Sequence, residues 1–206
     1  DRQKATVLLD ESRDRVYMAQ TGLIGGAFPN HKTPMTFSGE RVLKDGTNEL
    51  VVKFQSPDLG GVRLVETYTL ARGSYAVRVK HEVVNTGTVP VSPQLYLQLV
   101  RDGNKPPGES SFYSTFTGPA VYTEQDKYQK VSFEDIDKGK AKYAQKADNG
   151  WIAMVQHYFV TAWLPQGNGE REFYINKLSE GLYRAGIVLP MAQIAPGTSG
   201  KISVQL

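Results

Sequence analysis

The clearest feature of the chain is an alternation of apolar and polar residues that recurs over most of its length. Tyr75, Val77, Val79 and Val83 fall on one side of such a stretch, and mostly polar residues lie between them. A period of two predicts a half-buried β-strand, because successive side chains of a strand point to opposite faces. Turn residues flank the stretch at 72–74 and 85–87, as expected for consecutive β-hairpins.

The same pattern predicts strands along the whole chain and only one helical turn, at 133–138. The predicted strands are 5–9, 16–20, 36–42, 50–55, 62–70, 75–84, 89–100, 151–156, 159–164, 171–178, 182–189 and 201–206. With further short segments we expect about fifteen strands, and the hairpins from residue 36 to 100 predict an antiparallel meander. This spacing is typical of a large all-β antiparallel sandwich. No repeat of fixed period supports a propeller or a solenoid.

The most apolar stretch runs from Gly150 to Pro165 and contains both tryptophans of the chain. β-Branched and aromatic residues dominate it, which favours two strands over one helix. Large aromatic side chains remove much apolar area from water when they are buried. We therefore expect these two strands to lie in the middle of the sandwich.

The composition of the 206 residues is that of an ordinary globular protein, with 40% hydrophobic and 22% charged residues. This length predicts one domain over residues 1–206. The net charge of +3 gives no argument for nucleic acid binding, and the absence of cysteine excludes disulfides, thiol catalysis and zinc–cysteine sites. No apolar run is long enough to span a membrane. The chain begins at Asp1 and ends on a strand-like segment, so we expect the parent protein to continue on both sides.

No arrangement of residues in the sequence is typical of a catalytic site. The three histidines, His31, His81 and His157, lack the short spacing of a metal site, and we expect each to be structural, although folding could bring them together. Glu66 and Glu82 are expected on solvated strand faces. The glycine-rich segment 21–30 lacks the Lys-Ser/Thr ending of a phosphate-binding loop and predicts a turn. The sequence therefore predicts no catalytic, cofactor-binding or metal-binding residues.

The segment from residue 102 to 149 is the least regular and the richest in aromatic and charged residues. For its most charged part, residues 124–149, a solvated surface excursion is the favoured interpretation. The alternative is a basic patch, interleaved with aromatic rings, that contacts a partner or anionic lipid headgroups. The residues predicted for partner contact are Phe112, Tyr113, Phe116, Tyr122, Lys127, Tyr128 and Lys130.

Several longer motifs occur in a fixed order along the chain. They are Tyr-Met-Ala-Gln-Thr-Gly-Leu at 17–23, Leu-Ala-Arg-Gly-Ser-Tyr-Ala-Val at 70–77 leading to Val-Asn at 84–85, Phe-Thr-Gly-Pro-Ala-Val-Tyr at 116–122, Asp-Lys-Tyr at 126–128, and the tryptophan stretch 150–165. With these motifs the whole chain resembles the large periplasmic domain of the YidC membrane protein insertases of Gram-negative bacteria.

This resemblance implies a β-supersandwich, the fold of galactose mutarotases, at the periplasmic face of the inner membrane. It implies a non-catalytic interaction domain without cofactors, soluble itself but tethered to the membrane between the first transmembrane helix and a five-helix insertase core. The implied partners are the SecDF complex and other Sec translocon components, contacted through residues 100–149. A cleft for nascent membrane-protein segments or a sugar-like ligand is a further implication, and nucleic acid is not expected.

Two alternative functions stay open at this point. A sugar-binding or aldose-epimerase-like enzyme would need two histidines and a glutamate around a sugar ring, which His81, His157 and a glutamate could supply. The local motifs of that family are absent from the sequence. A secreted adhesin or lectin-like sandwich fits the composition but leaves the YidC-like motifs unexplained.

Overall fold

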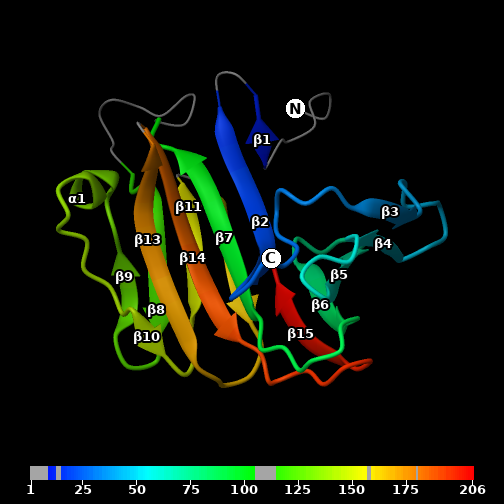
Figure 1. The fold of residues 1–206 in the computed structure, drawn as a ribbon. Coiled ribbons are helices and arrows are strands. Elements are labelled where there is room, and N and C mark those ends of the chain that lie inside the picture. The colour runs from blue at the N-terminus through cyan, green and yellow to red at the C-terminus, as the bar shows by residue number, and fades with distance from the viewer. Residues whose placement is uncertain (1–8, 13–14, 105–114, 157–158, 180) are drawn as a thin grey trace.

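The structure, a computed structural model, describes residues 9–12, 15–104, 115–156, 159–179 and 181–206. These residues form fifteen strands and one short helix, α1 (Phe133–Asp137). Every pair of neighbouring strands in the two sheets is antiparallel, from the short β1–β2 hairpin to the long β13–β14 hairpin. The predicted class, an all-β antiparallel supersandwich with at most short helical turns, is confirmed (Figure 1).

One layer is a six-stranded sheet with β7 and β14 at its centre. Its order is β1 (Asp10–Glu11), β2 (Val16–Ile24), β7 (Gln94–Asp102), β14 (Leu182–Pro190), β13 (Arg171–Ser179) and β10 (Lys146–Ala147).

The other layer is a nine-stranded sheet that begins with a four-stranded meander. Its order is β3 (Thr36–Gly39), β4 (Glu49–Gln55), β5 (Val62–Ala71), β6 (Val77–Asn85), β15 (Ser199–Gln205), β12 (Phe159–Pro165), β11 (Trp151–Gln156), β8 (Gly118–Thr123) and β9 (Lys127–Lys130).

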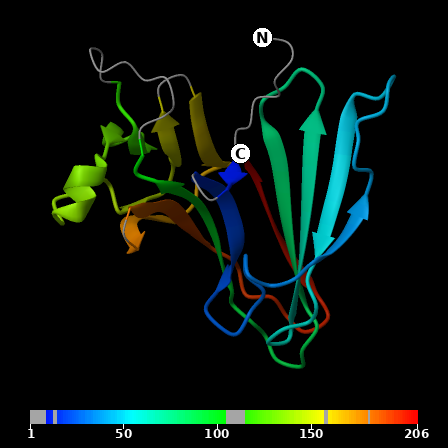
Figure 2. The same ribbon diagram turned by 90° about the horizontal axis from the view of Figure 1, so that it is seen from above.

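The nine-stranded sheet extends beyond the six-stranded one. Figure 1 shows β7, β13 and β14 in front of β8 and β11, while the meander β3–β6 lies to the side of β2. Figure 2, seen from above, shows the meander standing apart on the far side of β2. One end of the nine-stranded sheet is therefore covered by the six-stranded sheet, whereas the meander at the other end extends beyond it.

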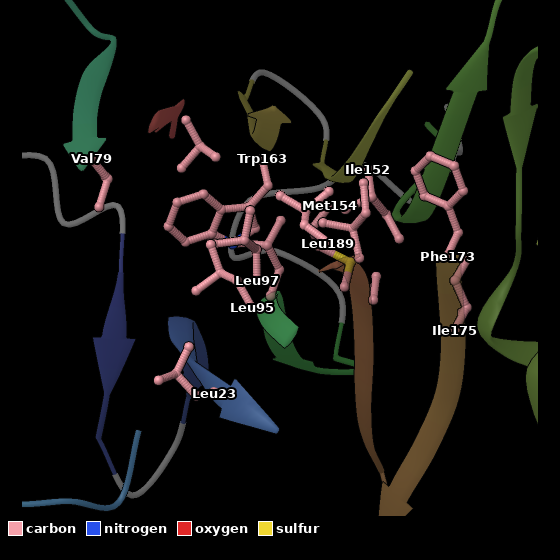
Figure 3. Close-up of a cluster of buried hydrophobic side chains, with 14 of the residues drawn as sticks. Leu23, Val79, Leu95, Leu97, Ile152, Met154, Trp163, Phe173, Ile175 and Leu189 are labelled. Atoms are coloured by element: carbon pink, nitrogen blue, oxygen red, sulfur yellow. The ribbon is translucent and has the colours of Figure 1, made fainter. Parts of the chain in front are cut away.

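The core between the layers is centred on Trp163 of β12, which is only 1% exposed. Its indole N–H donates a hydrogen bond of 3.1 Å to the backbone carbonyl of Gln98 in β7, so its one polar group is satisfied across the layers. Figure 3 shows the indole beside Leu95 and Leu97 of the facing sheet, with Met154 of the same sheet close by. The tryptophan stretch forms two paired strands, as predicted. The expectation that both strands are buried is wrong for β12, where Phe159 and Val160 are exposed and Trp163 faces the core.

One glycine permits a contact that no other residue could make. Gly150 has a positive φ of 102°, and a Cβ atom there would lie 2.0 Å from the carbonyl oxygen of Tyr122. This glycine therefore lets the start of β11 approach β8 closely.

Two predicted boundaries are wrong for identifiable reasons. β2 continues through Thr21–Ile24, which the sequence analysis assigned to a loop, because these residues pair with β7. The segment predicted as a strand from 89 to 100 does not extend the meander: β7 starts only at Gln94, after Pro93, and lies in the other sheet. Proline has no N–H to donate, so the strand begins after it.

The charged segment 124–149 is more structured than the favoured interpretation allowed. It contains β9, α1 and β10, and β9 and β10 add a strand to each sheet. Ser132 caps α1 by accepting a hydrogen bond from the backbone N–H of Asp135. The predicted helical turn is confirmed. The charged side chains of the segment are solvated, as the favoured interpretation expected, but its backbone forms regular secondary structure.

Replacing Trp163 by alanine is expected to lower the free energy of unfolding by about 3–5 kcal/mol, because it leaves a large cavity between the sheets. Replacing Trp151, which lies on the outer face and is partly exposed, is expected to cost less than half as much. Urea unfolding of both variants, followed by circular dichroism, measures the two losses. An equal or larger loss for Trp151→Ala would contradict the assignment of Trp163 as the centre of the core.

Candidate functional site

Three aromatic residues lie side by side on the outer face of β11, β8 and β9. Trp151 is directly opposite Tyr122, and Tyr122 is directly opposite Tyr128. Their chain neighbours Ile152 and Val121 are fully buried in the core, so the aromatic set points away from the core. We call Phe116, Tyr122, Tyr128, Lys130 and Trp151 the aromatic platform.

The rings of the platform contact one another and a lysine. Tyr122 and Trp151 are stacked, with ring centroids 5.5 Å apart and planes 13° from parallel, and Tyr128 lies 6.0 Å from Trp151. The Lys130 ammonium lies 5.1 Å from the ring centroid of Phe116 and 5.9 Å from that of Tyr128. These are cation–π distances, and they hold the lysine head over the aromatic surface.

The structure gathers four of the seven residues predicted for partner contact: Phe116, Tyr122, Tyr128 and Lys130. Lys127 is exposed at the start of β9 with a positive φ of 59°, and Phe112 and Tyr113 lie outside the described residues. Trp151 was missed because the sequence analysis assigned both tryptophans to the core. The alternation of Trp151 with Ile152 and Met154 was the signal that could have placed it on the outer face.

A second feature is a hollow between β2 and the inner face of the meander, with a volume of about 480 Å³. We call it the acidic hollow, because the carboxyl groups of Asp10, Glu11 and Glu66 line it. Its lining residues come from β1, β2, the loop before β3, β4 and β5, and they include Asp10, Glu11, Tyr17, Met18, Thr21, His31, Met35, Phe54, Glu66 and Tyr68.

Glu66 of β5 lines this hollow, and the fully buried His81 lies directly opposite it on β6. The Tyr68 hydroxyl donates to Oε2 of Glu66 over 3.0 Å, and Nε2 of His81 is 2.8 Å from the Thr21 hydroxyl. Oε1 of Glu66 and Nδ1 of His81 make no hydrogen bond within the described structure. Oε1 is 3.9 Å from Nε2 of His81, too far for a hydrogen bond.

The prediction that Glu66 lies on a solvated strand face is wrong, since it is 5% exposed. It shares the phase of Val62 and Leu64, whose side chains face the core, so the pairing of β5 directs it inward. Glu82 does lie on the outer face, where it contacts Ser199 and Lys201.

Burial changes the protonation of both groups. It raises the pKa of Glu66 to about 7, although the hydrogen bond from Tyr68 opposes the shift. Burial also lowers the pKa of His81 to about 4, so the imidazole is neutral at pH 7. Glu66 therefore has no strong cationic partner in the described structure.

A second hollow of about 660 Å³ adjoins the first and shares Asn30 and His31 with it. Its charged lining residues, Lys32 and Arg184, are basic. Nδ1 of His31 is 2.5 Å from the Tyr96 hydroxyl, and Arg184 lies over the ring of Tyr174. His31 is thus hydrogen-bonded within the fold, and His157 lies outside the described residues.

Among the described residues, no group of three or more His, Asp or Glu side chains could hold a metal ion. No helix in the same part of the chain is long and apolar enough to cross a membrane.

A family profile described as YidC periplasmic domain matches residues 1–206. The chain belongs to the YidC periplasmic domain family. The family places the domain at the periplasmic face of the bacterial inner membrane, as the sequence motifs predicted.

Full-length relatives share about half of the residues. A membrane protein insertase YidC from Janthinobacterium sp. (strain Marseille) is 50% identical over 208 residues, covering all of this chain and 36% of the relative. That of Aromatoleum aromaticum is 49% identical, covering all of this chain and 38% of the relative. The chain thus spans little more than a third of the length of these insertases.

Similarity to solved structures is much weaker. The α-galactosidase AgaA of Geobacillus stearothermophilus superposes with a TM-score of 0.46 at 12% identity, over 91% of this chain and 29% of the enzyme. A protein assigned as an aldose 1-epimerase from Escherichia coli K12 gives 0.42 at 9% identity, over 79% of this chain and 66% of that protein. Similarity at this level carries no argument about function.

The buried carboxyl predicts a pH-dependent difference between the wild type and Glu66→Gln. The pKa of Glu66 is about 7 in the folded protein and 4.5 in the unfolded chain, so protonation of Glu66 favours the folded state. This contribution to stability is complete below pH 4.5 and is lost as pH rises through about 7. From pH 5 to pH 8 the variant should therefore gain stability relative to the wild type, by of order 3 kcal/mol in total.

Urea unfolding of both proteins across this pH range measures the difference. The lowered pKa of His81 has the opposite effect: it makes the folded protein more stable as pH rises toward 6.5. His81 is present in both proteins, so its effect cancels in the comparison. A stability difference that does not change with pH would contradict the burial of an ionisable Glu66.

Proposed function

We propose that residues 1–206 form one non-catalytic interaction domain of a YidC-type insertase, which contacts other translocase components such as SecDF through the aromatic platform. The observation that supports this proposal most directly is the row of Trp151, Tyr122 and Tyr128 on an outer sheet face. The row lies at one end of the nine-stranded sheet. Two of the strands at this end, β8 and β9, belong to residues 100–149, the segment expected to contact the partner. Contact with nascent membrane-protein segments stays a prediction.

The chemistry of the platform suits protein recognition. Tyrosine and tryptophan combine a large apolar surface with a polar group and are frequent among the residues that dominate binding energy at interfaces. Tyr128 is 45% exposed and next to the exposed Lys130, so a partner can reach both. Lys130 and Lys127 favour a partner surface with negative charge at the rim of the contact.

The geometry supports a non-catalytic role over the epimerase alternative. That alternative needs histidine and carboxylate groups that touch a sugar, but His81 has no exposed surface and Glu66 is 5% exposed. Glu66 lines the acidic hollow but His81 does not, so the two groups cannot act together on a sugar ring there. A mutarotation assay with galactose tests this point, and a rate above the uncatalysed background would revive the alternative.

The double variant Trp151→Ala/Tyr128→Ala is expected to bind purified SecDF at least tenfold more weakly than the wild-type chain, because it removes two adjacent aromatic anchors. Biolayer interferometry with SecDF in detergent measures the affinity. Tyr75→Ala is the matched control, since Tyr75 is 98% exposed and lies outside the platform. We expect this control to bind like the wild type.

Circular dichroism shows whether the double variant stays folded. Equal binding by the folded double variant and the wild type would contradict the platform as the contact surface. No measurable binding by the wild type would contradict the choice of SecDF as the partner.

A further inference from the structure

The acidic hollow has an unbalanced charge. Three carboxyl groups line it, from Asp10, Glu11 and Glu66, and no lysine or arginine does so among the described residues. The hollow lies on the meander side of β2, whereas the aromatic platform lies at the opposite end of the nine-stranded sheet (Figure 1). Any role of the hollow is therefore separate from the proposed function.

Glu66 is the feature that sets the hollow apart from an ordinary acidic surface. Its side chain is almost completely buried, and one oxygen, Oε1, has no hydrogen-bond partner within the described structure. A buried carboxylate without a cation is unfavourable, and the nearest basic group, His81, is held neutral by its own burial. The site is electrostatically incomplete, and a cation from outside would complete it.

The walls of the hollow suit a cation that has an apolar stem. Phe54 and Tyr68 contribute aromatic rings, which lie 5.8 Å apart at an angle of 86°. Met18 and Met35 add thioether side chains, which adapt to irregular apolar groups. Aromatic rings attract ammonium and guanidinium groups through their π faces. The volume of about 480 Å³ falls in the range of small-molecule sites.

We propose that the acidic hollow binds an organic cation, a primary ammonium or guanidinium group on a flexible aliphatic chain, with Glu66 as its counter-charge. The stem packs between Phe54, Tyr68 and the methionines. Asp10 and Glu11 attract the cation at the rim. Two sources offer this chemistry, a free polyamine and a lysine or arginine side chain of a peptide, and the binding experiment separates them.

Binding of a cation by Glu66 requires its ionised form, so the affinity depends on pH. The titratable groups around this carboxyl are Asp10 and Glu11 of β1, Tyr17 of β2, His31 before β3, Tyr68 of β5, His81 of β6 and Tyr96 of β7. β4 contributes the uncharged Phe54 to the same hollow. Burial raises the pKa of Glu66 to about 7, between these two conditions, so affinity should fall more than about tenfold from pH 8.5 to pH 5.5.

Isothermal titration of the chain with three probes tests the proposal: spermidine, a five-residue peptide with one central lysine, and the same peptide with norleucine in place of lysine. We expect saturable binding of spermidine, of the lysine peptide or of both, and none of the norleucine peptide. Binding of spermidine alone assigns the site to free polyamines. Stronger binding of the lysine peptide assigns it to a protein side chain.

Glu66→Gln keeps the shape of the side chain and removes its charge, so it should weaken binding at least tenfold and abolish the pH dependence. Glu82→Gln, on the outer face of the same sheet, is the matched control and should bind like the wild type. Asp10→Asn/Glu11→Gln at the rim provides a second test that leaves the buried pair intact, with an expected loss of about threefold.

Three results would overturn the proposal. They are the absence of saturable binding by both cationic probes, equal binding by the wild type and Glu66→Gln, and saturable binding of the lysine and norleucine peptides with equal affinity. Because no partner protein is present in this experiment, its outcome is independent of whether the aromatic platform binds SecDF.

Discussion

The register of strand pairing in the nine-stranded sheet is the constraint on which the rest of the structure depends. Side chains alternate between the two faces of a strand, so a shift of one residue would exchange core and surface. Pairing Ile152 with Trp163 directs both side chains into the core between the layers. The same register leaves Trp151 and Tyr122 opposite each other on the outer face. The register of strand pairing therefore produces both the core and the aromatic platform.

The same alternation accounts for the buried polar pair at the other end of the sheet. Glu66 and His81 occupy inward positions among valines and a leucine, and the pairing of β5 with β6 places them directly opposite each other. The six-stranded sheet ends near this point, so the inner face of the meander borders a hollow instead of a second layer. An ionisable pair therefore lies at the boundary between the closed core and an open cavity.

Burial and neighbouring charge set the behaviour of that pair. Desolvation disfavours the charged form of each group, so it raises the pKa of Glu66 and lowers that of His81. Thr21 and Tyr68 satisfy part of the hydrogen-bonding capacity and leave one atom of each side chain without a partner. The platform and the hollow differ in kind: the platform is a partly exposed aromatic surface with a lysine, and the hollow is a recessed acidic surface.

The sequence by itself determined the all-β class, most strands, the helical turn at 133–138 and the central place of the tryptophan stretch, because these follow from local alternation and turn residues. The ordered motifs also predicted the YidC periplasmic domain family. Only the tertiary structure decided which sheet β7 joins, that Trp151 lies outside while Trp163 lies inside, and that Glu66 is buried beside His81. These features depend on pairing between segments far apart in the chain, and local alternation shows that a strand has two faces without showing which face the folded protein covers.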